Sequence, residues 1–379
     1  MHIQQLHFLS GQWNTQKTDA GFNAAKCQLA LVFGAHSCIA DPAFLAGLQQ
    51  RFPAAQSVLC STSGEIIGDA VFDESAVVTA VDFDHTTIRP VMTNIGRHAG
   101  SYEAGRYLME QLQEGRPGNV FILSDGMHVN GSELAAGLNE NNHDHIPVTG
   151  GLAGDATRFA HTLVGLNGPP GEGNIVAIGL YGDRLHIGHG SFGGWDEFGH
   201  ERAITRSDKN VLYELDGRSA LDLYKEYLGP YVDELPGSAL LFPLSLRIND
   251  SGQNLVRTIL SIDEKEKSMT FAGNLPEGSK VRLMKANFDK LIDGSATAAR
   301  NAFTPLRHPP ALAILISCVG RRLVLQHRVD EEVQAAKEIF GDSTVISGFY
   351  SYGEISPLQP TSRCELHNQT MTITTFSES

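Results

Sequence analysis

The sequence predicts an α+β protein with two mixed sheet-and-helix domains. Apolar runs of strand length alternate with helical patterns, and 379 residues exceed what one core comfortably holds. A short phrase also occurs twice. An apolar run ends in Ser37-Cys38, and the next leads into 61–66 (STSGEI); later, a run ends in Ser317-Cys318, and the next leads into 350–355 (YSYGEI). We hypothesise that the domains are related by internal duplication. The alternative is two unrelated tight turns whose glycines supply a positive φ.

Composition narrows the class of protein. The formal net charge of −14 argues against binding to nucleic acid or to an anionic membrane surface, because both need a cationic face. Five cysteines without a CxxC pair do not resemble a disulfide framework or a zinc ribbon. The start of the chain shows no signal peptide, and no apolar run is long enough to span a membrane. We therefore expect a cytoplasmic protein.

The first half should contain several short strands and three helices. Ala104, Leu108 and Leu112 recur at i+4 steps within a helix that Gly115 ends. The strands at 76–83 and 88–92 alternate in polarity and are expected to pair as antiparallel sheet. The expected strands are 29–33, 57–59, 76–83, 88–92, 120–123, 146–148, 159–166, 175–181 and 185–188, and the helices are 44–50, 98–114 and one from about Ser132.

A glycine-rich segment, 188–200, separates the two halves and is expected to be a junction or a loop that faces a ligand. We place the boundary after it, which gives domains 1–200 and 201–379. The second half should contain strands at 203–206, 239–246, 254–262, 268–273, 312–317, 348–355 and 371–376, and helices at 219–228, 287–301 and 330–340.

The sequence lacks most of the motifs that mark common enzyme classes. Residues 188–193 match GxGxxG, but a turn and a strand follow them, whereas a dinucleotide site needs a helix N-terminus. The chain has no GxxxxGK[ST], HExxH or GxSxG motif. Asp125, Asp155, Glu65 and Glu354 could form an acid–base group if they converged, but capping carboxylates are the alternative. We expect a protein that is not an enzyme, and a hydrolase or transferase stays the alternative.

Histidines near the glycine-rich segment are candidate metal or haem ligands. His189 and His200 lie within it, and His367 follows Cys364 in a CxxH pattern. That pattern lacks the second cysteine of a c-type haem attachment. For each histidine, an ordinary solvated or hydrogen-bonded side chain is the alternative. Arg321 could bind a carboxylate or pair with a surface glutamate, and Asn368 could bind polar groups or hydrogen-bond a turn.

Seven motifs in order resemble the FIST sensory proteins over nearly the whole chain. They are 60–66 (CSTSGEI), 150–155 (GGLAGD), 214–217 (ELDG), 242–244 (FPL), 317–321 (SCVGR), 348–355 (GFYSYGEI) and 366–371 (LHNQTM). The resemblance implies a FIST N-type domain at 1–200 and a FIST C-type ligand-sensing domain at 201–379. It also implies a small-molecule ligand and a separate signalling partner.

Chains of this length are similar to the NosP group, which implies haem b, nitric oxide sensing, and a histidine kinase or cyclic-dinucleotide enzyme as partner. Under this resemblance we expect His189, His200 and His367 to bind the cofactor, with His189 as the metal ligand. A sensor of a small polar metabolite such as an amino acid, without haem, is the alternative. The ligand contacts expected then are Arg321, Tyr352, Glu354, His367 and Asn368.

Overall fold

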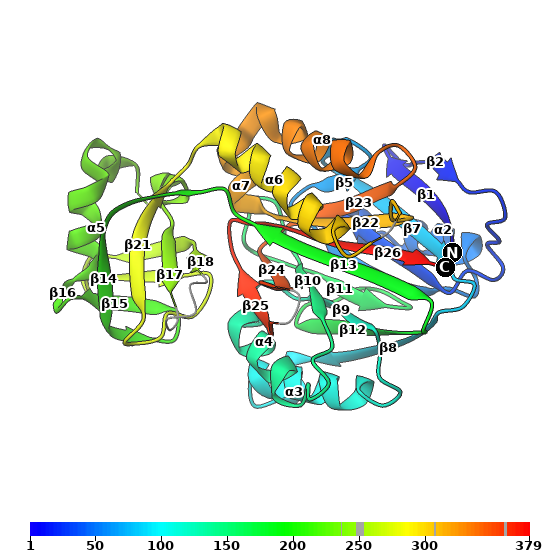
Figure 1. The fold of residues 1–379 in the computed structure, drawn as a ribbon, viewed down its shortest axis with the longest axis horizontal. Coiled ribbons are helices and arrows are strands. Elements are labelled where there is room, and N and C mark those ends of the chain that lie inside the picture. The colour runs from blue at the N-terminus through cyan, green and yellow to red at the C-terminus, as the bar shows by residue number, and fades with distance from the viewer. Residues whose placement is uncertain (236, 248–253, 307, 360–361) are drawn as a thin grey trace.

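The structure is a computed structural model that describes residues 1–379 except 236, 248–253, 307 and 360–361. Figure 1 shows a large body that carries both chain termini at one end, and a smaller β-rich body at the other end. The smaller body runs from Asp196 to Lys285 and is called the inserted domain, because the chain on both sides of it folds into the large body. Within the described residues, no helix combines the length and the apolar character that crossing a membrane requires.

The large body contains three six-stranded mixed sheets. In the order of hydrogen-bonded neighbours, sheet A is β11 (Val164–Leu166), β4 (Gln56–Ser61), β3 (Leu29–Gly34), β7 (Ser75–Asp82), β1 (His2–Leu9) and β2 (Gln12–Thr18). Sheet B is β13 (Leu185–Phe192), β26 (Met371–Glu378), β22 (Leu312–Cys318), β23 (Val345–Ser351), β5 (Glu65–Ile67) and β6 (Ala70–Phe72). Sheet C is β25 (Cys364–His367), β24 (Gly353–Pro357), β10 (Val148–Leu152), β9 (Asn119–Ser124), β12 (Asn174–Tyr181) and β8 (Thr87–Asn94).

The same unit builds all three sheets. Each unit has a parallel strand pair (β3–β4, β9–β10 or β22–β23) and a later strand (β7, β12 or β26) that returns antiparallel beside the first member. Between the parallel pair and the returning strand, the chain forms one strand that pairs in another sheet. Strand β5 leaves for sheet B, β24 for sheet C and β11 for sheet A. The exchange is cyclic, so each sheet is completed by a strand from another unit.

Helices cover the outer faces of the sheets. Helices α6 and α8 lie over sheet B, and α3 and α4 lie under sheet C (Figure 1). Helix α2 packs on sheet A. The helices are α1 (His36–Ile39), α2 (Pro42–Arg51), α3 (Ser101–Leu112), α4 (Gly131–Glu140), α5 (Ala220–Leu228), α6 (Phe288–Phe303), α7 (Val319–Leu325) and α8 (Val329–Phe340), with short 3₁₀ turns η1 (Ile95–Arg97), η2 (Gly229–Glu234), η3 (Gly237–Leu241) and η5 (Gln326–Arg328).

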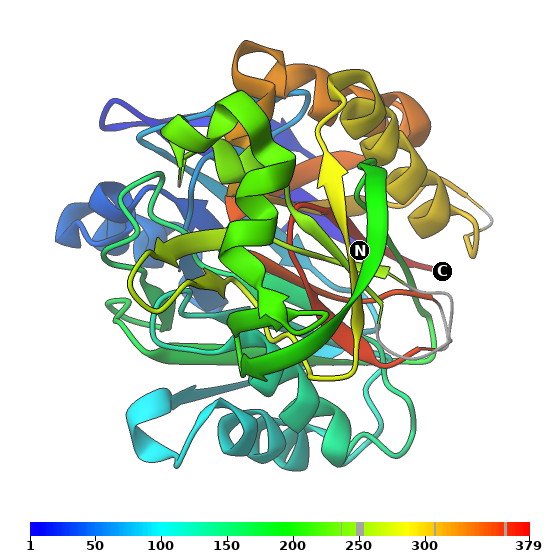
Figure 2. The same cartoon turned by 90° about the vertical axis from the view of Figure 1, so that its left-hand side faces the viewer.

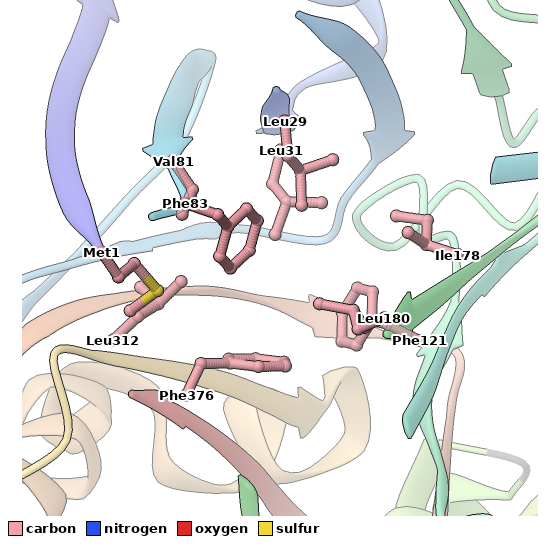
Figure 3. Close-up of a pocket in the computed structure, with 10 residues that line it drawn as sticks. All are labelled: Met1, Leu29, Leu31, Val81, Phe83, Phe121, Ile178, Leu180, Leu312 and Phe376. Atoms are coloured by element: carbon pink, nitrogen blue, oxygen red, sulfur yellow. The ribbon is translucent and has the colours of Figure 1, made fainter. Parts of the chain in front are cut away.

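The inner faces of the three sheets meet in one apolar core. Figure 3 shows its end near the N-terminus, where side chains from all three sheets, among them Leu31, Phe121 and Leu312, surround a small apolar cavity. Strands β3, β9 and β22 are buried on both faces, between this core and the helices. This explains why they occur in the sequence as continuous apolar runs rather than alternating ones.

The two Gly-Glu-Ile phrases occupy corresponding places, as the duplication hypothesis requires. Ile66 pairs with Gly348, which lies beside the fourth residue of β22; Ile355 pairs with Gly150, which lies beside the fourth residue of β9. The third exchanged strand has the same register, with Gly165 opposite Leu59. In that copy, Val164 stands where the other two have glutamate. The structural repeat is therefore threefold, and the copy built from β9, β10 and β12 lacks the Gly-Glu-Ile phrase.

Glu65 and Glu354 make equivalent hydrogen bonds in their units. Each carboxyl accepts a hydrogen bond from a hydroxyl three residues earlier: Thr62 Oγ1 at 2.5 Å and Ser351 Oγ at 2.7 Å. Each also accepts bonds from the N–H and hydroxyl of a residue at the start of the returning strand, Ser75 or Thr370. Burial raises the pKa of Glu65 to about 7 and that of Glu354 to about 8, because desolvation outweighs these hydrogen bonds.

The inserted domain is an eight-stranded antiparallel sheet with α5 against its core. Its neighbouring strands are β18 (Asn254–Arg257), β17 (Leu244–Arg247), β21 (Lys280–Lys285), β14 (Asp196–Asp208), β15 (Val211–Leu215), β20 (Ser268–Phe271) and β19 (Ile259–Asp263), and β16 (Arg218–Ser219) pairs with β15. Figure 2 views the molecule from this side and shows the strands of the inserted domain in front of the large body.

The predicted fold class, mixed sheets with helices, is confirmed, but some local expectations were wrong. Segments 76–83 and 88–92 do not pair: β7 lies between β1 and β3 in sheet A, whereas β8 pairs with β12 in sheet C. In the range 159–166, only β11 is extended, and most of 188–200 belongs to β13 and β14 rather than to a loop. Strands β1 and β2 and helix α7 were not predicted. The sheets of the large body contain strands from both sides of residue 200. The division of the chain into domains 1–200 and 201–379 remains a prediction.

The raised pKa of Glu354 predicts a pH-dependent stability. The folded protein keeps this proton up to about pH 8, whereas the unfolded chain loses it near the ordinary value of 4.5. Stability from this group is therefore complete below pH 4.5 and is lost as the pH rises to about 8, by at most about 1.4 kcal/mol per pH unit. Glu354→Gln should flatten the dependence of the unfolding free energy on pH, measured by urea denaturation. The exposed Glu338→Gln on α8 is the control, and equal slopes in all three proteins would contradict the assignment.

Candidate functional site

A cavity of about 600 Å³ lies between the large body and the inserted domain and is called the interdomain cavity. The large body contributes the loop after β9, the end of β10 and two aromatic side chains; the inserted domain contributes β19, β20 and the residues beside them. The lining residues are Gly126, Met127, His128, Val129, Asn130, Gly131, Leu152, Phe159 and Tyr352 from the large body, and Asn210, Leu260, Phe271 and Ala272 from the inserted domain. Its size suits a small organic ligand.

The loop between β9 and α4 is held in shape by two capping side chains. Asp125 Oδ1 accepts the backbone N–H groups of Met127 at 2.8 Å and His128 at 2.6 Å. Asn130 Oδ1 caps α4 by accepting the N–H groups of Ser132 and Glu133. Because these donors are already bonded, the start of α4 does not offer the free N–H groups that an anion would need.

An aromatic pair forms one wall of the cavity. The rings of Tyr352 and Phe159 stack with centroids 4.5 Å apart and an interplanar angle of 17°. The Tyr352 hydroxyl accepts the N–H of Phe159 at 3.1 Å and donates to the carbonyl of Ala156 at 3.3 Å. Burial raises the pKa of Tyr352 to about 12, so the ring presents a neutral phenol. Phe159 is 40% exposed and offers an apolar face to a ligand.

Two linkers connect the inserted domain to the large body (Figure 1). Arg321 contacts the first linker and the start of α6, just beyond the second linker. Its guanidinium group is fully buried and donates to the carbonyl of Gly193 in the first linker and to that of Leu291, just beyond the second linker, at 2.8 Å. It also donates to the carbonyl of Gln369 at 3.3 Å and to Glu332 of α8 at 2.6 Å. Arg321 therefore fixes where the inserted domain joins the large body, and we call this group of contacts the hinge.

A second set of contacts holds the inserted domain to the start of α4 and is called the latch. Asn130 Nδ2 donates to Asn274 Oδ1 at 3.0 Å, and Asn274 N donates to Ser132 Oγ at 3.1 Å. Lys209 of the inserted domain forms an ion pair with Glu133 at 2.9 Å. The interdomain cavity is bounded by the latch residue Asn130, so breaking the latch would open the cavity while the hinge stays joined.

The five residues expected to contact a ligand lie in one region of the structure. Tyr352 lines the cavity, and Glu354 and Asn368 lie behind that wall. Arg321 is nearby, but its donors are taken up by protein carbonyls and by Glu332. His367 is also buried there, and its Nε2 lies 2.9 Å from the carbonyl of Ser356. Burial lowers the pKa of His367 to about 4, which keeps the ring neutral, and the ring nitrogen that donates to Ser356 is not available to a metal.

The three histidines expected to bind a cofactor lie on three different sheets. His189 is on β13 in sheet B, His200 is exposed on β14 of the inserted domain, and His367 is on β25 in sheet C. His189 lines a separate cavity of about 370 Å³ beside the C-terminal end of α6, and burial lowers the pKa of His189. Among the described residues, no group of three histidine, cysteine, aspartate or glutamate side chains is arranged to hold a metal ion. The expectation that His189 binds metal stays a prediction.

Several cavity residues were missed by the sequence analysis. Met127, His128 and Asn130 follow a correctly predicted strand, and the position of a loop at a strand end was the available signal. Phe159 was placed in a strand, and Asn210 and Phe271 belong to the inserted domain, whose approach to the loop after β9 has no local signal in the sequence.

Comparison with protein-family models gives two matches that together cover most of the chain. The FIST N domain model matches residues 28–218, and the FIST C domain model matches residues 220–357. A comparison with curated proteins found no match.

The latch predicts a controllable opening of the inserted domain. Asn274→Ala removes a hydrogen bond to Asn130, and a loss of about 1 kcal/mol would raise the open population about five-fold. Spin labels at the exposed positions Glu140 and Lys265, in a Cys38→Ser background, would report this as a longer and broader distance distribution. Arg218→Met, which breaks the Arg218–Glu226 pair inside the inserted domain, is the control. An unchanged distribution in Asn274→Ala would show that these contacts do not hold the domain.

Proposed function

Because the chain belongs to the FIST family, whose domains are signal-transduction sensor domains that bind small ligands, we propose that it is a non-catalytic sensor whose ligand occupies the interdomain cavity. One observation carries the proposal: residues of two bodies wall the cavity. Among the described contacts between these bodies are the hinge, the latch, a hydrogen bond from the buried Arg257 to the carbonyl of Leu366 at 3.0 Å and an apolar cluster around Trp195. A ligand that touches both walls would favour the closed arrangement, and this differential binding is what a sensor needs.

The lining of the cavity supports binding rather than catalysis. Its residues are apolar, aromatic and amide side chains, with His128 and Tyr352 as the titratable groups. The carboxylates considered for acid–base chemistry have structural partners instead. Asp125 caps a loop, Asp155 pairs with Arg158 at 2.5 Å, and Glu65 and Glu354 tie exchanged strands to returning ones. A hydrolase or transferase would need a nucleophile and a base together, a pairing that these lining residues do not offer.

The signal would pass to a separate protein. Both matched domains are sensory, and the buried Arg321–Glu332 pair connects the hinge with α8 on the outside of sheet B. A change at the hinge would therefore reach an exposed helix face. A histidine kinase or a cyclic-dinucleotide enzyme in the cytoplasm is the partner we propose, and the net charge of −14 would favour a basic docking face on it.

A small polar metabolite such as an amino acid is one candidate ligand. Thermal unfolding in the presence of each of the twenty amino acids would detect it as a rise in melting temperature. We expect the rise to disappear in Phe159→Ala, which removes half of the stacked pair, and to persist in Tyr107→Ala, which truncates an exposed ring on α3 away from the cavity. Equal responses of the two variants would place the ligand elsewhere.

Haem b, with nitric oxide as the signal, is the second candidate, and the character of the interdomain cavity favours it. Met127, Leu152 and Phe271 give the cavity apolar walls, and His128 would supply the imidazole that holds the haem. His128 Nδ1 lies 3.2 Å from Asp125 Oδ1, which would orient the ring, and its Nε2, now 3.9 Å from Glu172 Oε2, would bind the iron. Bound haem would supply the nitric oxide chemistry. The surroundings of His189 fit a porphyrin less well, because its cavity of about 370 Å³ is smaller than the interdomain cavity.

An absorption spectrum with added haemin tests this candidate. We expect a Soret band in the wild type that is lost in His128→Ala and retained in His189→Ala, His200→Ala and His367→Ala. Loss only in His189→Ala or His200→Ala would instead return the site to the glycine-rich segment. Absence of the band in the wild type would eliminate haem as the ligand.

A further inference from the structure

Hydrogen bonds from several elements fix the backbone of the turn that joins β25 to β26. The carbonyl of Gln369 accepts Trp195 Nε1 at 2.8 Å as well as the Arg321 guanidinium. Thr370 N donates to Glu354, and its carbonyl accepts Cys318 N at 3.2 Å. These contacts fix the turn while leaving its side chains out of the network.

The side chains of this turn are buried amides without partners. Asn368 and Gln369 are both 0% exposed. Within the part of the chain that the structure describes, neither the nitrogen nor the oxygen of either amide has a hydrogen-bond partner. Buried amides are almost always bonded, because an unmade bond forfeits the hydration of both groups. Four unpaired atoms on neighbouring residues therefore indicate a polar occupant.

The threefold repeat shows that the turn itself does not need these amides. The residues that precede Ser75, Asn174 and Thr370, at or next to the start of the three returning strands, have a left-handed backbone, with φ of 48° at Glu74, 71° at Gly173 and 58° at Gln369. Residues Asp73 and Glu74 of the first unit are exposed and charged. The same backbone conformation is thus formed with solvated side chains in the first unit. Burial of two amides is therefore particular to the unit built from β22, β23 and β26.

Two glycines shape the space around the amides. A Cβ at Gly320 would lie 2.4 Å from Gln369 Nε2, so a side chain there would displace the amide. A Cβ at Gly353 would lie 3.7 Å from Asn368 Nδ2, and the residue before Gly353 is Tyr352 of the cavity wall. The amide pair therefore lies directly behind the interdomain cavity.

We propose that Asn368 and Gln369 form the specificity-determining part of the ligand site and bind an uncharged group with both a donor and an acceptor, such as a carboxamide or a urea. The proposal rests on the proposed sensor function and deepens it. An uncharged group is favoured because Arg321, the cation beside the turn, already neutralises Glu332 and has no donor left for an anion.

Binding at these amides would change the contacts of the hinge. Trp195 lies at the end of the first linker, and Arg321 bonds to Gly193 of that linker and to Leu291 at the start of α6; both donate to the carbonyl of Gln369 itself. A ligand at the amides would therefore bond to the residue that anchors the first linker. This gives ligand occupancy a direct route to the position of the inserted domain.

Stability measurements on ligand-free protein test the first half of the proposal. Asn368→Leu replaces unpaired amide atoms and should leave the melting temperature unchanged or raise it. Asn139→Leu is the matched control, because both atoms of that buried amide are bonded to Cys364, at 2.8 and 3.2 Å, and it should lower the melting temperature by several degrees. Gln369→Met should behave like Asn368→Leu. Losses in Asn368→Leu and Gln369→Met equal to that of Asn139→Leu would overturn the proposal.

Fluorescence of Trp195, with Trp13 changed to phenylalanine, tests the second half with acetamide and acetate as matched probes. We expect a saturable change with millimolar acetamide, at least a ten-fold weaker response to acetate at pH 7, and loss of the acetamide response in Asn368→Leu. Retention of the response in Asn368→Leu, or its absence in the wild type, would sink the proposal. Ligand-induced closure lost in Phe159→Ala but kept in Asn368→Leu would show that the sensor function stands without it.

Discussion

The guanidinium group of Arg321 is the interaction on which the arrangement of the molecule depends. It joins the linkers of the inserted domain, the turn before β26 and helix α8 through hydrogen bonds to three carbonyls and one carboxylate. Glu332 balances its charge in a fully buried pair and also accepts the hydroxyl of Tyr350. Removing one member of such a pair leaves an uncompensated charge in the core, which costs several kcal/mol, about 3–5. The arginine is therefore committed to structure, although its sequence position beside a strand end is equally typical of a ligand contact.

The cyclic exchange of β5, β11 and β24 determines which part of the protein can move. Each sheet is completed by a strand of another unit, so no unit can shift without breaking a ladder of backbone hydrogen bonds. The shared apolar core adds the same constraint, since packed interiors do not deform continuously. The inserted domain carries a core of its own and is joined to the large body through two linkers and an apolar cluster around Trp195. We therefore expect hinge motion in the inserted domain rather than within the large body, and the interdomain cavity, which both bodies wall, would change its shape with that motion.

Sequence reasoning succeeded where burial alone decides the pattern and failed where distant backbone pairing decides it. Doubly buried strands such as β3 and β22 carry continuous apolar runs and were placed within a residue or two. Strand β5 is only three residues long, and apart from its hairpin partner β6 the sheet that it joins is far away in sequence, so its pairing with β23 has no local signal. The candidate site divides in the same way. Tyr352 and Asn368 were proposed because they lie in motifs of the family resemblance, whereas Phe271 lies near Tyr352 only through the docking of the inserted domain, which has no local signal in the sequence.

Comparison among the three units separates structural groups from functional ones. Glu65 and Glu354 make equivalent bonds in two units, and only the second lies near the cavity, so the carboxyl is explained by the strand exchange that both serve. The amides of Asn368 and Gln369 have no such counterpart, because the corresponding turns carry solvated acids or glycine. Proteins keep a destabilising group in a core only where something other than folding requires it. The unit that follows the inserted domain in the chain is also the one that buries two unpaired amides. The bonds of Trp195 and Arg321 to the carbonyl of Gln369 connect these amides with the inserted domain rather than with the features that the three units share.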